Sequence, residues 1–248
     1  MGRTAAALVI GNEILTGKVE EANVPRLARL LFGLGIELQR VVVCPDVIET
    51  IAADVNALRS AHDFLFTSGG VGPTHDDVTV DAIAHAFGRR VVRSAEVEKL
   101  IREYHAQRGM PVTEAHLRLA NVIEGARLVR NATVAWPTIV MENVYVLPGV
   151  PEIFELKLAQ LRDELATDEA FVGVAVYTRC DEGDIAALLH DLAHAHPRVT
   201  IGSYLKWRSE DYRVKITFDG REAADVHAAA HAFIEAIGAA MLVRREGF

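Results

Sequence analysis

Length, composition and charge place the chain among ordinary globular proteins. It has 248 residues, 50% of them hydrophobic and 24% charged, which excludes a disordered, collagenous or coiled-coil chain. The 26 Lys and Arg against 34 Asp and Glu give a formal charge of -8, so no basic field is available to hold nucleic acid or an anionic membrane. We therefore expect neither of these as a partner.

The cysteines and the N-terminus point to the cytoplasm. Cys44 and Cys180 lie far apart and form no C-x-x-C motif, so we expect no disulfide framework or thiolate zinc site but two core thiols in a reducing compartment. The apolar run from Ala5 to Ile10 is too short for a signal sequence or a membrane span. We expect a cytoplasmic protein.

The first part of the chain has the pattern of a βαβ protein. Up to about residue 90, apolar runs alternate with amphipathic stretches, and this alternation predicts an α/β fold with a parallel sheet. We expect strands over 4–10, 36–43 and 63–67, helices over 24–34, 47–59 and 78–87, and loops over 11–23 and 68–77.

The middle of the chain adds helices and a hairpin. Residues 94–120 predict two helical pieces broken near Pro111, and residues 138–141 and 144–147 predict the two strands of a hairpin. Pro151 suits the first turn of a helix that ends near Leu165.

The remaining residues predict a second domain. Strands are expected over 170–178, 199–203, 212–218 and 240–244, with helices over 183–195 and 222–237. This β-α-β-β-α-β order is that of a ferredoxin-like domain. We place the boundary near residues 166–169, with one domain at 1–168 and the other at 169–248.

Polar and glycine residues follow the first three predicted strands. Ligands bind beyond the carboxyl ends of parallel strands, and glycines let backbone N–H groups approach a phosphate. The first loop carries Gly11, Asn12, Glu13, Thr16 and Gly17, the second carries Asp46, and the third carries Ser68, Gly69, Gly70, Gly72, Pro73, Thr74, His75, Asp76 and Asp77. This pattern predicts a phosphate-bearing small molecule as ligand.

Carboxylates on the same edge predict a divalent cation. Glu13, Asp46, Asp76 and Asp77 would repel a bare phosphate, whereas Mg²⁺ is held by one or two carboxylates together with phosphate oxygens. Asp is also favoured at the start of a helix, so we expect one of Asp76 and Asp77 to cap the helix at 78–87 and the other to face the ligand.

Other motifs favour ordinary structural roles. Residues 11–18 have the wrong spacing for a Walker A loop, and no G-x-G-x-x-G motif is present. The pairs His190 with His194 and His227 with His231 favour solvated helix faces, and Trp136 favours core or interface. His75 is left open between ligand contact and simple exposure.

Three ordered motifs carry a family resemblance. Residues 11–17 with Asn23, residues 67–79, and residues 147–152 with Pro148 and Gly149 together resemble the molybdopterin-binding domain of molybdenum-cofactor biosynthesis. The chain looks most like the branch shared by competence/damage-inducible protein A and the N-terminal domain of FAD synthase. Residues 201–207 and 212–215 are similar to the FAD synthase type, so the resemblance covers nearly the whole chain.

The resemblance implies a fold, a site and an activity. It implies a three-layer domain with a mostly parallel sheet, in which Asp46 and Asp77 match two aspartates at the ligand edge and residues 69–74 hold a phosphate. It adds Asn23, Pro148 and Gly149 to the ligand-binding residues. The implied reaction is cleavage of a dinucleotide pyrophosphate such as ADP-ribose or FAD, with Mg²⁺, Mn²⁺ or Co²⁺. We expect Asp46 and Asp77 to be the catalytic residues, which hold the cation or position water.

Two further readings stay open beside that one. The superfamily resemblance also permits molybdopterin as ligand, with binding or adenylyl transfer in cofactor assembly, and the site could equally bind a nucleotide without catalysis. Residues 132–138 depart from the bacterial pattern and leave the substrate undetermined. Because the sequence ends at Phe248, we expect neither the adenylyltransferase domain of FAD synthase nor an amidase domain, and relatives imply a homo-oligomer.

Overall fold

The computed structural model describes residues 2–130, 136–166, 170–208 and 210–248. The chain divides into two compact units, Met1–Phe32 with Ile36–Ala166, and Gly33–Gly35 with Thr167–Phe248. We call these the N-terminal and C-terminal domains. Within the described residues, no helix combines the length and the apolar character needed to cross a membrane.

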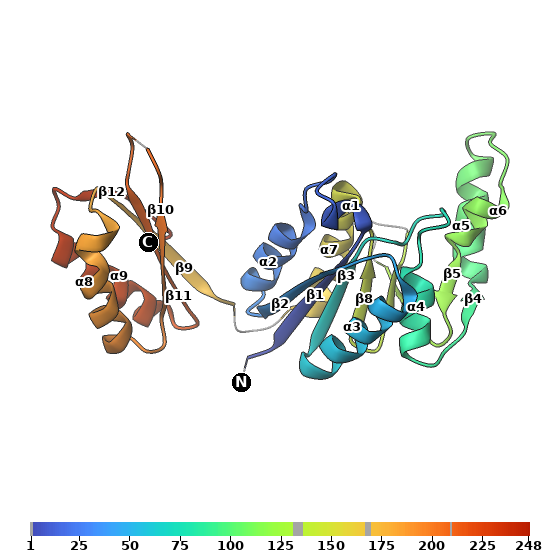
Figure 1. Cartoon of the computed structure of the whole chain (residues 1–248), viewed down its shortest axis with the longest axis horizontal. Helices are drawn as coiled ribbons and strands as arrows, with labels where there is room; N and C mark the ends of the chain where they lie inside the picture. Colours follow the sequence, from blue (N-terminus) through green and yellow to red (C-terminus); the bar gives the residue numbers. More distant parts are fainter. Residues whose placement is uncertain (1, 131–135, 167–169, 209) are drawn as a thin grey trace. The chain divides into compact units, whose positions relative to one another are not determined.

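The N-terminal domain contains the predicted alternation of strands and helices (Figure 1). Its elements are β1 (Thr4–Ile10), α1 (Asn12–Leu15), α2 (Asn23–Gly33), β2 (Glu37–Cys44), α3 (Ile48–Ala61), β3 (Phe64–Ser68), α4 (Thr79–Ala86), β4 (Val91–Arg93), α5 (Ala95–Ala106), α6 (Glu114–Arg118), β5 (Asn121–Ile123), β6 (Arg127–Val129), β7 (Thr138–Met141), β8 (Val144–Leu147) and α7 (Pro151–Leu165).

Four short elements differ from the prediction. The single turn of α1 lies in the segment expected to be loop, and β4, β5 and β6 were not expected. Each has only three or four residues, which is too few for a hydrophobic period to show in the sequence. β4 and β5 exist because they pair with each other, across the segment that holds α5 and α6.

The six-stranded sheet has the order β2-β1-β3-β8-β7-β6. β1 pairs in parallel with β2 and β3, and β3 in parallel with β8, whereas β7 is antiparallel to both of its neighbours. The predicted mostly parallel sheet and the predicted hairpin of β7 and β8 are confirmed. The carboxyl ends of β1, β2, β3 and β8 therefore meet at one edge.

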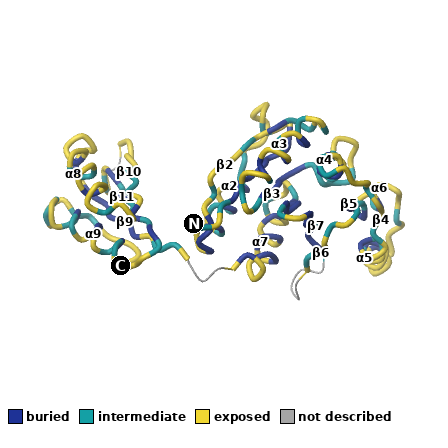
Figure 2. Tube along the Cα trace, turned by 90° about the horizontal axis from the view of Figure 1, so that it is seen from below, coloured by how far each residue is buried: buried dark blue, intermediate teal, exposed yellow. Residues whose placement is uncertain are grey.

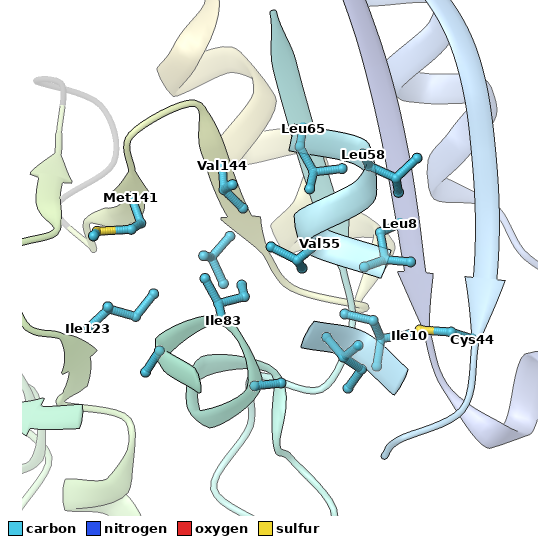
Figure 3. Packing of buried hydrophobic residues seen from close by; sticks show 14 of the residues in the cluster. Leu8, Ile10, Cys44, Val55, Leu58, Leu65, Ile83, Ile123, Met141 and Val144 are labelled. Atoms are coloured by element: carbon cyan, nitrogen blue, oxygen red, sulfur yellow. The ribbon is translucent and has the colours of Figure 1, made fainter. Parts of the chain in front are cut away.

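Helices cover both faces of this sheet, which completes three layers. Leu8 and Ile10 of β1 pack with Val55 of α3 and Ile83 of α4 in one core (Figure 3). Alternate residues of a strand point to opposite faces, so the equally buried Ala5, Ala7 and Val9 face the other layer. Figure 2 shows α7 on the side of the sheet opposite α3.

The C-terminal domain has the predicted ferredoxin-like topology. Its elements are β9 (Val172–Thr178), α8 (Glu182–Ala195), β10 (Thr200–Leu205), β11 (Val214–Gly220), α9 (Ala223–Ile237) and β12 (Leu242–Glu246). The four strands form an antiparallel sheet in the order β10-β11-β9-β12. Phe218 of β11 and Phe233 of α9 are fully buried at the centre of its core.

Candidate functional site

The loops after β1 and β2 are joined by hydrogen bonds at the carboxyl edge of the sheet. The Gly11 N–H donates to the carbonyl oxygen of Cys44 at 3.2 Å, and the Asn12 N–H donates to Asp46 Oδ2 at 2.8 Å. Glu13 follows in the single turn of α1, which lies at this edge (Figure 1). One carboxylate oxygen of Asp46 thus fixes the first loop.

The glycine loop after β3 approaches the backbone of β1 closely. Gly69 has a φ of +106°, and a Cβ there would lie 2.1 Å from the carbonyl oxygen of Ile10, so only glycine fits. The buried Thr79 hydroxyl donates to the Gly69 carbonyl oxygen at 2.9 Å, and the Thr79 N–H donates to that of Gly70 at 3.0 Å. The first residue of α4 therefore holds the loop in place.

Three amide groups of this loop have no partner in the described part of the chain. The N–H groups of Gly70, Val71 and Gly72 donate to no other described residue. Successive backbone N–H groups left unpaired in a loop form a concavity suited to an anion. The loop thus has the donors that a phosphate requires.

Asp77 belongs to the same loop but does not cap the helix. Its Oδ2 accepts a hydrogen bond from the Thr74 N–H at 2.8 Å and from the Thr74 hydroxyl at 2.5 Å. A Cβ at Gly72 would lie 2.6 Å from the same oxygen, so the carboxylate occupies the space that glycine leaves.

The prediction that Asp76 or Asp77 caps the helix is wrong. α4 begins at Thr79, its N-cap residue is Val78, and no side chain caps it. The helix starts too late for either carboxylate to reach its first amides, and both turn back to Thr74. The Thr74 hydroxyl shares its single hydrogen between Asp77 Oδ2 and Asp76 Oδ1, which lies 2.6 Å away, and hydrogen bonding to Thr74 holds the pKa of Asp76 below its usual value.

A cavity of about 720 Å³ lies beside the glycine loop. This volume is within the range that small-molecule sites occupy. Its charged lining residues are Glu13, Asp77, Asp81, Arg118 and Lys157. Apolar side chains, among them Trp136, Ile139, Val150 and Ile153, line it as well. The cavity can therefore hold a ligand that has both a charged group and an apolar or aromatic part.

Some of the predicted site residues line this cavity and others do not. Those that line it are Glu13, Gly69, Gly70, Gly72, Pro73, Asp77, Pro148 and Gly149. Those that lie outside its lining are Gly11, Asn12, Thr16, Gly17, Asn23, Asp46, Ser68, Thr74, His75 and Asp76. Of the two predicted catalytic aspartates, only Asp77 borders the cavity.

Two residues outside the lining illustrate different roles. The buried Asn23 donates from Nδ2 to Ser68 Oγ at 2.9 Å and to the Gly149 carbonyl oxygen at 2.8 Å, so it ties α2 to the end of β3 and to the loop after β8. The side chain of His75 is 97% exposed.

Several lining residues belong to none of the sequence motifs. They are Asp81, Arg118, Asn121 and Lys157, and Trp136, for which the sequence favours core or interface, lines the cavity as well. Trp136 both lines the cavity and packs against the small core of α5 and α6. Lys157 did leave a signal, because it falls at helical spacing among the buried apolar residues of α7, which are Phe154, Leu158, Leu161 and Leu165.

The two cysteines are buried thiols, as predicted. Burial, together with the nearby carboxylates of Asp54 and Asp46, raises the pKa of Cys44 to about 12. The thiol is therefore protonated at neutral pH and supplies no thiolate nucleophile or metal ligand.

The carboxylates of the cavity suit only one kind of metal site. The described residues contain no group of three or more His, Cys, Asp or Glu side chains close enough to hold a metal ion by themselves. Glu13, Asp77 and Asp81 nevertheless line one cavity with the glycine loop. Such a donor set fits a cation shared with phosphate oxygens of a ligand, and it does not fit a metal held by protein groups alone.

The fold and the cavity define a class of protein, an α/β domain with a cavity at the carboxyl edge of its parallel strands. The family model described as "Probable molybdopterin binding domain" matches residues 6–166, and the chain belongs to that family. The model of the "FAD synthase, middle domain" matches residues 170–246. The family resemblance expected from the three motifs is confirmed.

Relatives cover both domains. A probable FAD synthase of Caenorhabditis elegans is 32% identical in sequence, and the match covers 91% of this chain and 48% of that protein. The chain thus spans about half the length of the FAD synthase relatives it matches. A protein of Archaeoglobus fulgidus is 33% identical over 226 residues, 91% of this chain and 94% of its own length.

A solved structure supports the fold of the N-terminal domain. The crystal structure of CinA from Thermoplasma acidophilum, titled as a protein with unknown function, is 26% identical in sequence and has a TM-score of 0.58. The match covers 66% of this chain and 98% of that one.

Proposed function

We propose that the chain hydrolyses the pyrophosphate bond of a dinucleotide of the ADP-ribose or FAD type, with the help of a divalent cation. One observation carries the proposal: Gly70, Val71 and Gly72, whose amides have no partner among the described residues, line the same cavity as Asp77. A phosphate held by the amides would lie next to a group that can position water. The FAD synthase relatives and the family match support a nucleotide-related ligand.

In this proposal, some residues of the cavity bind the ligand and another takes part in the reaction. The loop amides hold one phosphate, and Trp136 offers an aromatic face to a ring of the ligand. Asp77 Oδ2 is held by Thr74, and Asp77 Oδ1 accepts no hydrogen bond within the described residues, so Oδ1 can orient the attacking water. The water oxygen bonds to one phosphorus and the bridging P–O bond breaks. The products are AMP and the remaining phosphomonoester, and the proton of the water passes to solvent.

A divalent cation, Mg²⁺, Mn²⁺ or Co²⁺, would neutralise phosphate charge during this reaction. Glu13 and Asp81, the other carboxylates that line the cavity, are the groups that we assign to it, together with phosphate oxygens of the ligand. Asp46 is the second predicted catalytic residue, and one of its oxygens holds the Asn12 amide. We propose that Asp46 acts by positioning the first loop, which carries Glu13 into the cavity.

The experiment is to incubate the purified chain with ADP-ribose or FAD, with and without each cation, and to follow AMP by chromatography. We expect cation-dependent AMP release that falls at least about 100-fold in Asp77→Asn. The matched control is Asp163→Asn, which changes an exposed carboxylate of α7 outside the cavity lining. Equal rates in wild type and Asp77→Asn would rule out the assigned role of Asp77.

Molybdopterin binding or adenylyl transfer is the second candidate, favoured by the family model that matches residues 6–166. Absence of AMP from every dinucleotide, together with micromolar binding of molybdopterin, would select it. Thermal stabilisation by a nucleotide without product would instead indicate a non-catalytic binding module. A homo-oligomer in the cytoplasm remains our expectation, and light scattering of the purified chain measures the oligomeric state.

A further inference from the structure

Lys157 is a buried charge on the α7 wall of the cavity. Its residue is only 5% exposed, yet it belongs to the cavity lining. Its Nζ donates to the carbonyl oxygen of Pro137 at 2.7 Å and to that of Trp136. An ammonium group has three N–H donors, so one remains after these two bonds.

No carboxylate neutralises this ammonium group. Within the described part of the chain, Lys157 forms no ion pair, although thirteen other pairs are present there. Burial alone lowers its pKa to about 8, so the charged form still predominates at pH 7. Burying an unpaired charge is costly, and proteins normally supply a partner. Here the partner can come from the ligand.

Among the charged groups of the cavity, Lys157 is the best placed to bind an anionic group of the ligand. They are Glu13 of α1, Asp77 of the glycine loop, Asp81 of α4 and Arg118 of α6. None of them accounts for the shifted pKa of Lys157, whose only cause is burial. Arg118 is an exposed residue, so its cation is already solvated. The cation that gains most from an incoming anion is therefore the buried one.

We propose that Lys157 is a second anion subsite of this cavity and binds the second phosphate of a diphosphate ligand, while the glycine loop binds the first. The proposal rests on the proposed function, because it assigns that ligand's two phosphates to two walls of the same cavity. It concerns binding alone, so it can be tested without hydrolysis.

The test uses inorganic pyrophosphate and inorganic phosphate as probes, measured by titration calorimetry in buffer that contains Mg²⁺. Both probes can occupy the glycine loop, but only pyrophosphate can also reach the subsite. We expect Lys157→Gln, which keeps an N–H donor for the two carbonyls, to weaken pyrophosphate binding roughly 10- to 100-fold and phosphate binding little. Lys99→Met, at an exposed lysine of α5, is the control and should change neither.

A second measurement separates ligand binding from a purely structural role. An anion bound to Lys157 raises the pKa of the ammonium group, so pyrophosphate binding at pH 8 should take up protons in wild type beyond those taken up in Lys157→Gln. Calorimetry in two buffers of different ionisation enthalpy measures this difference. Protection of Lys157 from an amine-modifying reagent by pyrophosphate gives the same answer in wild type if the variant fails to fold.

The outcomes discriminate between the two proposals. Equal weakening of both probes, no weakening, or no pyrophosphate binding by wild type would overturn the Lys157 subsite. Selective loss of pyrophosphate binding with no AMP release from any dinucleotide would retain the subsite and reject the pyrophosphatase.

Discussion

The two domains use their buried polar groups differently. Among the described residues, the buried polar side chains Asn23, Thr67, Ser68, Thr79, His105, Thr138, Lys157 and Gln160 lie in the N-terminal domain, and only Thr178 lies in the C-terminal domain. Several of the former hold loops at the carboxyl edge of the sheet. Burying polar groups costs free energy, so their concentration in the N-terminal domain agrees with the candidate site there.

The core of the C-terminal domain contains few buried polar side chains. Its core consists of apolar residues of β9, β11, α8 and α9, and β11 alternates buried and half-buried positions along its whole length. Such a sheet satisfies its backbone groups in regular ladders and needs few polar side chains inside. Apolar packing therefore determines the structure of the C-terminal domain, whereas hydrogen-bonded loops determine the shape of the candidate site in the N-terminal domain.

The largest expected loss of stability comes from removing a buried aromatic ring from the core of either domain. Phe66→Ala in β3 and Phe218→Ala in β11 each remove a ring that is at most 1% exposed. Each should lower the free energy of unfolding of its own domain by about 3–5 kcal/mol. Hydrogen exchange read by mass spectrometry localises the loss. Equal loss of protection in both domains after either substitution would contradict the division into two folding units.

The next effect tests the strained loop. Gly69→Ala should cost more than about 2 kcal/mol in the N-terminal domain and abolish phosphate binding, because its Cβ meets the Ile10 carbonyl oxygen. Gly109→Ala is the matched control, since Gly109 also has a positive φ, of +63°, but no atom within 4 Å of the added Cβ. It should cost about 1 kcal/mol or less. Urea denaturation measures the free energy of unfolding of both variants. Similar losses at the two positions would show that the close contact with the Ile10 carbonyl oxygen is not the cause.

Lys157 should make the stability of the N-terminal domain depend on alkaline pH. Its pKa is lowered to about 8 by burial, below the ordinary value of 10.5, so between these values the unfolded chain binds more protons. The free energy of unfolding should therefore rise with pH over that window, by an amount of the order of 1–3 kcal/mol. Urea denaturation at several pH values measures it. The slope should be smaller in Lys157→Gln, and an unchanged slope would assign it to other groups.

The smallest effect concerns Asp219 in β11. Burial raises the pKa of this carboxyl above its ordinary value, so the folded domain binds its proton more tightly than the unfolded chain does. Its contribution to stability is present below the unfolded pKa and is lost as pH rises through the folded pKa. Asp219→Asn should therefore be slightly more stable than wild type at neutral pH, and Asp191→Asn, at an exposed position of α8, should not. Thermal unfolding at pH 3 and pH 7 compares them.

Much of the fold was predictable because long elements carry a period. The helices α2, α3, α7, α8 and α9 and the buried strands β1 and β3 repeat apolar residues often enough for the pattern to show. The one-turn α1 and the three-residue strands have no such repeat, and they form only because partners distant in sequence supply hydrogen bonds. The glycine loop was predictable because its sequence is rich in glycine. Gly69 has a positive φ, which residues with side chains rarely adopt, so glycine is needed there.

By itself, the sequence determined the class of fold, the glycine loop and the family of this chain, because these depend on local pattern and motif. Only the tertiary structure decided which residues share the cavity. It separated Asp77, which lines the cavity, from Asp46, which does not, and it brought Trp136 and Lys157 to the same space as Gly72. These residues lie far apart along the chain, and the packing of α6 and α7 beside the sheet edge is a sum of many contacts that no local pattern records.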